Sequence, residues 1–400
     1  MRRRDEGWDF RGTQATSGVY GIHPYPAMFH FGVVRGLLEE LSRPGELVLD
    51  PFVGSGVTAV ESAISGRPFY GCDLNPLAIM VSRVRTTPLP RARLLAALEQ
   101  VLAEAREVEA EPPHFPNLEF WFADEVIAEL ARLRAAVLHL PMGPLQDFFA
   151  AAFSETARGV SRTRPNEFKL LRRRNWEQFR PDVAVEFEGV ARRNIDLLDS
   201  FYRERAINAA VALETRDVLA GLPLPDEMVD LVVTSPPYGD SRTTVAYGQF
   251  SRLSLQWLGL EERVDRESLG RSTPEAGVRL PSEALYQALG KIASANAKRA
   301  AQVLAFYSDL DAAIGEVVRV LRPGGRVCFV VGNRRVAKTE LPTDRIVADL
   351  FCARGFTHRE TIVRAISNKR MPAENSPTNV PGQKERTMAH EYLVVLTKSG

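Results

Sequence analysis

A short apolar run that leads directly into a glycine loop limits the possible folds of this chain more than any other segment. Residues 47–50, Leu-Val-Leu-Asp, have the composition of a buried strand, and the loop that follows ends at Gly56. Apolar residues then recur at helical spacing over 57–64, and a second strand pattern covers 68–73. A strand, a glycine loop, a helix and a second strand open a doubly wound α/β sheet, so we predict that architecture.

The hydrophobic pattern divides the 400 residues into three parts. Residues 1–87 hold the strand-loop-helix-strand unit. Residues 88–209 show apolar side chains at three- and four-residue spacing between proline-rich breaks, which predicts a helical insertion. Strand patterns return in 210–400, which also contains a polar, mostly helical segment at 240–300. We therefore expect one sheet domain that is interrupted by the insertion.

Composition excludes several classes of protein. Lys and Arg total 51 against 50 Asp and Glu, so the chain is not a uniformly basic nucleic-acid coat, and any polyanion site depends on where the charges lie. The three cysteines are scattered and form no CxxC pair, which argues against a disulfide framework and against a metal site. The sequence has no signal-peptide pattern and no apolar run long enough for a membrane span, so we expect a cytoplasmic protein.

The loop from Asp50 to Gly56 is the first candidate binding site. Gly54 and Gly56 allow backbone N–H groups to approach a ligand at the carboxyl edge of the sheet. The third glycine of a dinucleotide fingerprint and the lysine of a P-loop are both missing, which disfavours a phosphate cradle. Asp73 closes the next strand pattern, where an acid can accept hydrogen bonds from both hydroxyls of a ribose. Its structural alternative is to cap the helix that starts near Pro76.

The second candidate site is the loop from Thr234 to Asp240. Pro236 and Pro237 forbid a helix and remove two N–H donors, which leaves carbonyl oxygens as rigid acceptors. Ser235 adds another acceptor, and Tyr238 adds a flat face. This set suits the exocyclic amine of a planar base, although a Ser-Pro-Pro turn taken alone is often purely structural.

Together the two loops resemble the amino-group DNA methyltransferases that use S-adenosyl-L-methionine. Asp50 to Gly56 matches the cofactor loop of that family, Ser235 to Tyr238 its catalytic loop, and Leu321 to Gly325 the turn before its fifth strand. His23 to Phe29 is similar to the segment that packs over the methionine end of the cofactor. The resemblance covers roughly 20–85 and 210–400, and it implies a Rossmann-like methyltransferase sheet with an antiparallel C-terminal strand.

The resemblance also implies the residues of the site. The catalytic residues are Ser235, Pro236, Pro237 and Tyr238. The cofactor-binding residues are Tyr25, Phe29, Asp50, Pro51, Phe52, Gly54, Ser55, Gly56, Asp73, Leu74, Asn75 and Asp217. Asp217 is placed near the adenine, although an acid in that position is also common in a solvated loop.

The expected reaction is methylation of an exocyclic amine on a base that is flipped out of the duplex. Serine at the first position of the catalytic loop resembles cytosine-N4 enzymes, because adenine-N6 enzymes usually carry Asp or Asn there. No cysteine follows a proline, which disfavours methylation of cytosine C5. The alternatives are an adenine-N6 enzyme, an RNA base methyltransferase, and a catalytically silent DNA-binding regulator on the same fold.

Contact with double-stranded DNA would come from local clusters of positive charge. Between residues 156 and 181 stand eight basic residues and two acidic ones. This stretch is either a DNA-contacting part of a target-recognition region in 88–209 or a solvated face that is paired with acids elsewhere. The candidate contacts are Arg172, Arg173, Arg174, Arg242, Lys369 and Arg370. We expect association with the nucleoid, a possible companion restriction endonuclease, and no partner metal or membrane.

Overall fold

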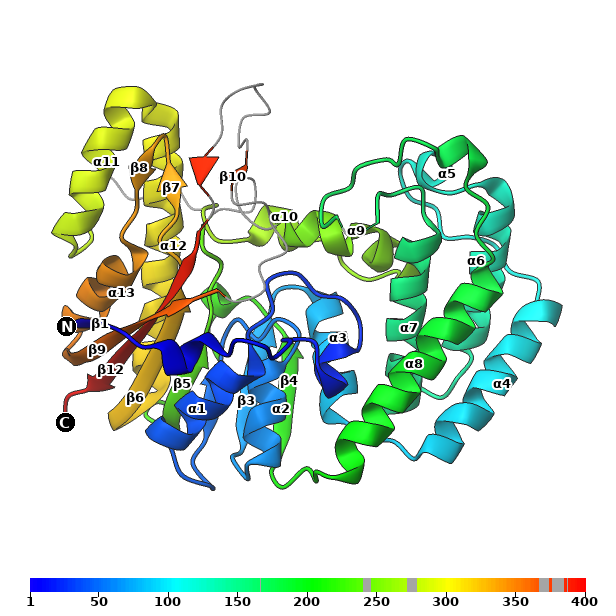
Figure 1. The fold of residues 1–400 in the computed structure, drawn as a ribbon, viewed down its shortest axis with the longest axis horizontal. Helices are drawn as coiled ribbons and strands as arrows, with labels where there is room; N and C mark the ends of the chain where they lie inside the picture. The colour runs from blue at the N-terminus through cyan, green and yellow to red at the C-terminus, as the bar shows by residue number, and fades with distance from the viewer. Residues whose placement is uncertain (166, 240–245, 272–278, 367–373, 376–384, 387) are drawn as a thin grey trace.

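The computed structural model describes residues 1–165, 167–239, 246–271, 279–366, 374–375, 385–386 and 388–400. Within these ranges, eight strands form one sheet in the order β1-β9-β12-β6-β5-β2-β3-β4 (Figure 1). The strands are β1 (Arg2–Arg4), β2 (Val48–Asp50), β3 (Phe69–Asp73), β4 (Val211–Thr215), β5 (Val229–Thr234), β6 (Leu321–Val331), β9 (Phe356–Ala365) and β12 (His390–Lys398). Two short hairpins pair β7 (Arg335–Val336) with β8 (Thr339–Glu340) and β10 (Glu374–Asn375) with β11 (Glu385–Arg386).

The direction of the strands confirms the predicted α/β fold. The neighbours from β6 to β4 are all parallel, whereas β12 is antiparallel to both β6 and β9. From β2 the chain continues to β3 and β4 on one side, and it then crosses to β5 and β6 on the other. The order of the strands therefore reverses between β2 and β5, and ligands of such sheets bind beyond the carboxyl ends of the strands at this point.

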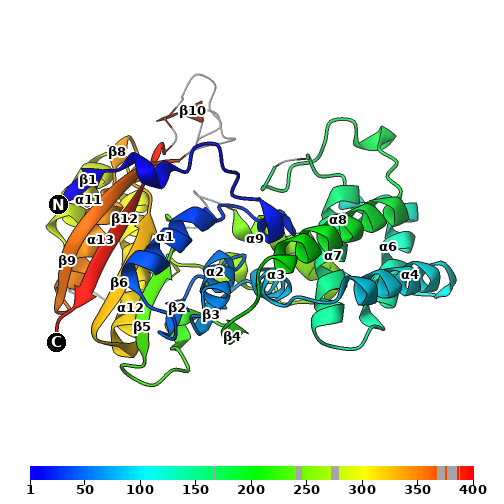
Figure 2. The same cartoon turned by 60° about the horizontal axis from the view of Figure 1, so that its bottom comes forward.

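Helices cover both faces of the sheet because its strands are apolar on both sides. Leu231 and Val233 of β5 join the hydrophobic cluster of α1 (Phe31–Leu41), α2 (Val57–Ile64) and α3 (Pro76–Thr86). Figure 2 shows these three helices in a row along one side of the sheet. Val229 and Val232 face the other cluster, which contains α11 (Glu283–Ala295), α12 (Ala297–Val320) and α13 (Thr343–Cys352).

A second group of helices lies beside the sheet, beyond β4 and α3 (Figure 1). It contains α4 (Arg91–Glu107), α5 (Leu118–Trp121), α6 (Asp124–Leu138), α7 (Pro144–Val160) and α8 (Val183–Arg203). Two further helices, α9 (Tyr247–Leu258) and α10 (Val264–Glu267), follow the reaction loop, Ser235 to Tyr238. The helix α7 packs against α3, α8 and α9, so this group shares the hydrophobic cluster of α1 to α3. A role for the group in target recognition stays a prediction.

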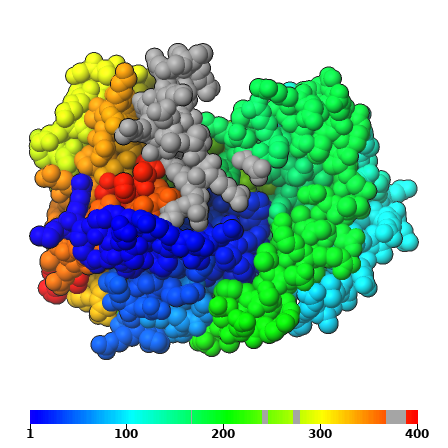
Figure 3. All heavy atoms as spheres, viewed as in Figure 1, coloured from blue at the N-terminus to red at the C-terminus, as the bar shows by residue number. Residues whose placement is uncertain are grey.

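Two features differ from the sequence patterns. The residues 322–325, expected as a turn before a strand, form a bulge within β6, because pairing with β5 passes directly from Leu321 to Arg326. The N-terminal strand β1 adds a parallel edge beside β9, and Figure 3 shows the chain that follows it crossing this face as a continuous band. In the part of the chain that the structure describes, no helix has the length and apolar character needed to cross a membrane.

Candidate active site

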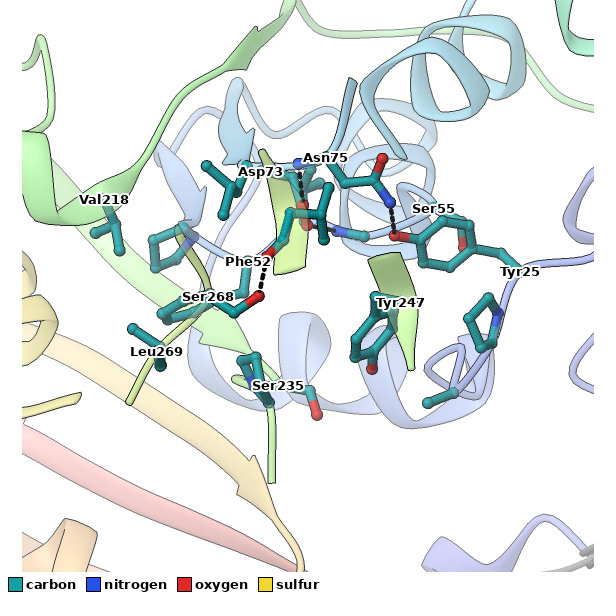
Figure 4. Close-up of a pocket in the computed structure, with 18 of the residues that line it drawn as sticks. Tyr25, Phe52, Ser55, Asp73, Asn75, Val218, Ser235, Tyr247, Ser268 and Leu269 are labelled. Carbon is teal, nitrogen blue, oxygen red and sulfur yellow. Dashed lines mark hydrogen bonds between the residues drawn. The ribbon is translucent and has the colours of Figure 1, made fainter. Parts of the chain in front are cut away.

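A cavity lies beyond the carboxyl ends of β2, β3 and β5, where the order of the strands reverses (Figure 4). Its walls come from the segment before α1, the glycine loop, the end of β3, the end of β4, the reaction loop and the residues around α9 and α10. Ten of the twelve predicted cofactor residues line it: Tyr25, Phe29, Pro51, Phe52, Gly54, Ser55, Asp73, Leu74, Asn75 and Asp217. Ser235 and Pro237 of the reaction loop line the same cavity.

Asp50 lies behind the cavity instead of lining it, and its side chain is only 1% exposed. Its carboxylate accepts hydrogen bonds from the Phe52 N–H at 3.1 Å, the Thr58 hydroxyl at 2.7 Å and the Thr234 hydroxyl at 2.6 Å. Burial raises the pKa of Asp50 to about 6, against the lowering effect of these donors. Asp50 therefore connects the glycine loop to the end of β5.

Gly56 also lies outside the cavity lining, and its role is close packing. Its φ angle is 82°, and a Cβ atom placed there would lie 2.7 Å from Ser82 Oγ and 2.9 Å from the Ser82 Cα. Only glycine fits this approach of the loop to α3 without movement of the backbone. The residue also begins α2 as its N-cap.

Asp73 faces the cavity and does not cap α3. Its two carboxylate oxygens accept hydrogen bonds from the N–H groups of Gly54 and Asn75, each at 2.9 Å. The cap is Asn75, whose side-chain oxygen accepts from the Leu77 N–H at 3.1 Å. Burial raises the pKa of Asp73 to about 6. Each oxygen keeps a further lone pair, so the carboxylate can also accept from a ligand.

Asn75 joins three elements at one wall of the cavity. Its amide nitrogen donates to the Tyr25 hydroxyl at 3.1 Å (Figure 4) and to the Ser251 hydroxyl of α9 at 2.6 Å. The Tyr25 ring lies 6.1 Å from the Tyr247 ring and 5.9 Å from the Phe250 ring, both in α9. The wall is therefore aromatic and is fixed by hydrogen bonds within the protein.

The structure adds residues to the cavity that the motifs did not indicate. Figure 4 shows Tyr247, Val218, Ser268 and Leu269 around the same space as Phe52, Asp73 and Ser235. Arg216, next to Asp217, is also part of the wall. The strand pattern that ends before Asp217 is the only sequence signal that could have indicated Arg216 and Val218, whereas nothing local indicates Tyr247.

Asp217 has partners of its own at the edge of the cavity. One of its oxygens accepts from the Leu219 N–H at 2.9 Å, and the other contacts the Arg271 guanidinium. It thus begins the short helical turn Val218–Ala220 while lining the cavity.

The reaction loop divides between the cavity and the sheet. The Ser235 hydroxyl donates to the Val330 carbonyl oxygen at 3.1 Å and lies 3.2 Å from the phenol oxygen of Tyr238. The Tyr238 phenol donates to Glu391 of β12 at 3.2 Å, and Glu391 is paired in turn with the buried Arg364 of β9. Burial raises the pKa of Tyr238 well above its ordinary value. Pro236 is buried, and Tyr238 does not line the cavity.

The basic candidates have different surroundings. The Arg172 guanidinium lies between two rings, 3.5 Å from the centre of Trp176 and 4.2 Å from that of Phe120. Arg173 lies 3.4 Å from the ring centre of Phe179 and donates to the Thr163 carbonyl oxygen at 3.1 Å. Arg174 is exposed. None of these three lines the cavity, and Arg242, Lys369 and Arg370 lie outside the described residues.

The basic stretch nevertheless contacts a helix of the cavity wall. The Phe168 ring lies 5.9 Å from the Phe250 ring of α9, and the Leu170 N–H donates to the Gln249 side chain at 3.3 Å. The Arg158 guanidinium lies 4.7 Å from the centre of the same Phe250 ring. Within the described ranges, no group of three or more His, Cys, Asp or Glu residues could hold a metal ion.

Comparison with known proteins identifies the family. A family model described as DNA methylase matches residues 2–82. The chain is 37% identical to the Type II methyltransferase M.MvaI of Kocuria varians, over 97% of this chain and 92% of that protein. It is 34% identical to the DNA adenine methyltransferase YhdJ of Escherichia coli over 17% of this chain and 22% of that protein. A DNA modification methylase from Thermus thermophilus, solved with S-adenosyl-L-methionine, aligns with 46% of this chain and 52% of that one at 23% identity, with a TM-score of 0.23.

The chain belongs to the amino-group DNA methyltransferases. This membership confirms the predicted class of enzyme, a DNA methyltransferase that uses S-adenosyl-L-methionine.

Proposed function

We propose that this chain transfers a methyl group from S-adenosyl-L-methionine to the N4 amine of cytosine in double-stranded DNA. The observation that carries the proposal is the hydrogen bond between Thr234 and Asp50. It holds the reaction loop against the glycine loop, so Ser235 and Phe52 line one cavity. An amine at Ser235 and a cofactor beside Phe52 would therefore meet within that cavity.

The cofactor-binding half of the cavity offers one acid for each polar part of a nucleoside. Asp73 has free lone pairs for the ribose hydroxyls, and Asp217, which lines the same cavity, is assigned to the adenine amino group. Phe52 and Tyr25 provide apolar surface for the methionine part. When bound, S-adenosyl-L-methionine supplies an electrophilic methyl group on a sulfonium.

Ser235 is prepared to accept a hydrogen bond from the amine. Its single hydroxyl hydrogen is directed to the Val330 carbonyl or to the Tyr238 phenol, both within the protein. The lone pairs of its oxygen are therefore available for an N–H of the base. We assign the second N–H to the carbonyl of Pro236, which is buried between the cavity-lining residues Ser235 and Pro237. These two acceptors orient the nitrogen lone pair, which is otherwise conjugated into the ring, and in-line transfer then depends mainly on positioning.

Serine at the first position of the reaction loop supports cytosine over adenine as the target. The adenine-N6 alternative has its own support, because YhdJ is named a DNA adenine methyltransferase. The two reactions share the cofactor and the acceptors, so they differ in the base that fits the pocket. Identification of the methylated nucleoside distinguishes them.

The target base is buried in the duplex and has to be flipped into the cavity. We assign contact with the flanking DNA to the helical part at 88–209, and in particular to its basic stretch, which touches α9 beside the cavity. The Kocuria varians relative is named a Type II methyltransferase, and this name supports a companion restriction endonuclease for this chain.

The test is incubation of the purified chain with labelled S-adenosyl-L-methionine and either unmodified DNA or RNA, followed by digestion and mass spectrometry. We expect N4-methylcytosine from DNA. Label only in N6-methyladenine would contradict the choice of base, and label only in RNA would contradict the choice of nucleic acid. The Ser235→Ala variant should lose activity, whereas Ser254→Ala, which removes a hydroxyl that donates to the Ser154 carbonyl away from the cavity, should keep it.

A further inference from the structure

Arg85 is a fully buried cation at the end of α3, with 0% of its surface exposed. Its oxygen acceptors among the described residues are all backbone carbonyls. It donates to Tyr20 at 2.8 Å, to Ile22 at 2.7 and 3.1 Å, to His23 at 3.2 Å and to Ser55 at 2.9 Å. Burial lowers its pKa to about 9, so it remains charged at neutral pH.

These acceptors belong to two separate walls of the cavity. Ser55 lies in the glycine loop and lines the cavity directly. Tyr20, Ile22 and His23 precede the stretch of Tyr25, Met28 and Phe29, which forms a neighbouring wall, and Figure 4 shows Tyr25 of this stretch beside Ser55. Arg85 also lies 3.4 Å from the sulfur of Met28. One guanidinium therefore bonds both walls at once.

The segment before α1 needs such an anchor because its backbone is strained. His23 and Ala27 have φ angles of 58° and 53°, in the left-handed region that residues other than glycine rarely adopt. This conformation persists only where the surroundings determine it. The carbonyls on either side of this bend, at Ile22 and His23, are held by Arg85.

We propose that Arg85 is a positioning residue for the methyl donor: it holds together the two neighbouring cavity walls that bind the cofactor, the glycine loop and the segment before α1. The proposal rests on the assignment of this cavity to S-adenosyl-L-methionine. The planar guanidinium has five donors in a fixed fork, which suits carbonyls on two sides. A lysine keeps the charge but concentrates its donors at one point, so it cannot bridge both walls in the same way.

The chain contains a matched control in Arg67, which is 5% exposed. Arg67 also donates to backbone carbonyls, those of Leu38 at 3.1 Å, Ser42 at 3.0 Å and Ser65 at 3.0 Å. It precedes β3, at the edge of the sheet opposite the cavity, and it does not line the cavity. Loss of either arginine removes a buried cation and several carbonyl partners, but only Arg85 connects the cavity walls.

The experiment compares Arg85→Lys and Arg85→Met with Arg67→Lys and Arg67→Met in the full chain. For each variant, urea unfolding gives the free energy of unfolding, calorimetry gives the Kd for S-adenosyl-L-methionine, and steady-state assays separate KM from kcat. The free energy of unfolding should be lower than in the wild-type chain for the two Arg85 variants and for the two Arg67 variants. We expect both Arg85 variants to raise Kd and the cofactor KM by about tenfold or more, with kcat at saturating cofactor much less affected. The Arg67 variants should keep the Kd of the wild-type chain.

Three results would overturn the proposal: wild-type affinity in folded Arg85→Lys, an equal loss of affinity in the Arg67 variants, or failure of both Arg85 variants to fold while those of Arg67 fold. The last result would mean that Arg85 serves the whole fold and not the cavity in particular. Absence of cofactor binding by the wild-type chain would instead contradict the proposed function, and it is measured before any variant.

Discussion

The Thr234 hydroxyl donates a hydrogen bond of 2.6 Å to the carboxylate of Asp50, and both side chains are buried. The two residues are the last of the neighbouring parallel strands β5 and β2. A carboxylate at this point costs free energy to bury, but it allows one side chain to hold the first turns of both functional loops. The glycine loop and the reaction loop are thus connected by a polar contact at the base of the cavity.

The buried acid predicts a dependence of stability on pH. The folded-state pKa of Asp50, about 6, is above its ordinary value of 3.8, so the folded chain binds more protons than the unfolded chain between these two values. The free energy of unfolding should therefore fall as pH rises from about 4 to 6 and should then level off. For a pKa raised from 3.8 to about 6, the total decrease should be about 3 kcal/mol. Asp73, with the same pKa of about 6, should add a similar change.

Urea unfolding between pH 4 and 7 checks this prediction with Asp50→Asn and Asp73→Asn. In each single variant, the decrease in the free energy of unfolding with pH should be smaller by about half of the part that the two acids cause. In the double variant that part should be absent. If the free energy of unfolding of Asp50→Asn depends on pH as steeply as that of the wild-type chain, Asp50 does not titrate in this range.

Asp73 should control binding of the cofactor. Asp73→Ala removes a carboxylate acceptor for the ribose, which we expect to weaken binding by about 1–3 kcal/mol. Because the ionised form is the better acceptor, wild-type affinity should also fall as pH is lowered through about 6. Calorimetry measures both effects. Asp311→Ala, which removes an acid paired with Arg354 away from the cavity, is the control, and equal affinities of the two variants would remove Asp73 from the site.

Glu391 should act on turnover through Tyr238, because its carboxylate accepts from the Tyr238 phenol. Tyr238→Phe keeps the ring and removes that bond, so we expect a lower kcat with little change in the Kd of the cofactor. Glu391→Gln should have a similar effect. If Glu391 acts only by holding the phenol, the double variant should be no slower than Tyr238→Phe. Fully additive losses in kcat would indicate a separate role for Glu391.

The two functional loops could be predicted because each is a short segment attached to a strand of its own. The strand that ends at Asp50 and the strand before Ser235 end at the same edge of a parallel sheet, and their loops meet because the two strands are neighbours. That rule selects Phe52, Asp73 and Ser235, and the structure places all three at one cavity, while their roles stay predictions.

Other residues could not be placed because their positions depend on packing between distant segments. Tyr247 reaches the cavity only because α9 packs against α3 and α7. Arg172 lies against Phe120, which no local pattern in the sequence brings close to it. The anchoring of the segment before α1 by Arg85 likewise requires the bend at His23, and histidine is only modestly favoured in such a conformation, so the sequence alone does not predict the bend.

The consecutive arginines 172–174 have different surroundings, so we expect different roles for them. Arg174 is exposed and should contact a DNA phosphate, so Arg174→Gln should weaken DNA binding and reduce the slope of log K against log salt by about one unit. Arg172, between the rings of Trp176 and Phe120, should mainly hold its segment in place. Arg172→Gln should therefore lower stability, by about 1–2 kcal/mol for the loss of stacked cation–π contacts, and change the salt slope less than Arg174→Gln.

Salt titrations of DNA binding, with each variant at several ionic strengths, check this division. Arg192→Gln is the control, because Arg192 is exposed on α8 but is paired with Glu188 one helical turn away. Its salt slope should equal that of the wild-type chain. An unchanged slope in Arg174→Gln as well would mean that the basic stretch is a solvated face, and contact with DNA phosphates would then have to come from other parts of the chain.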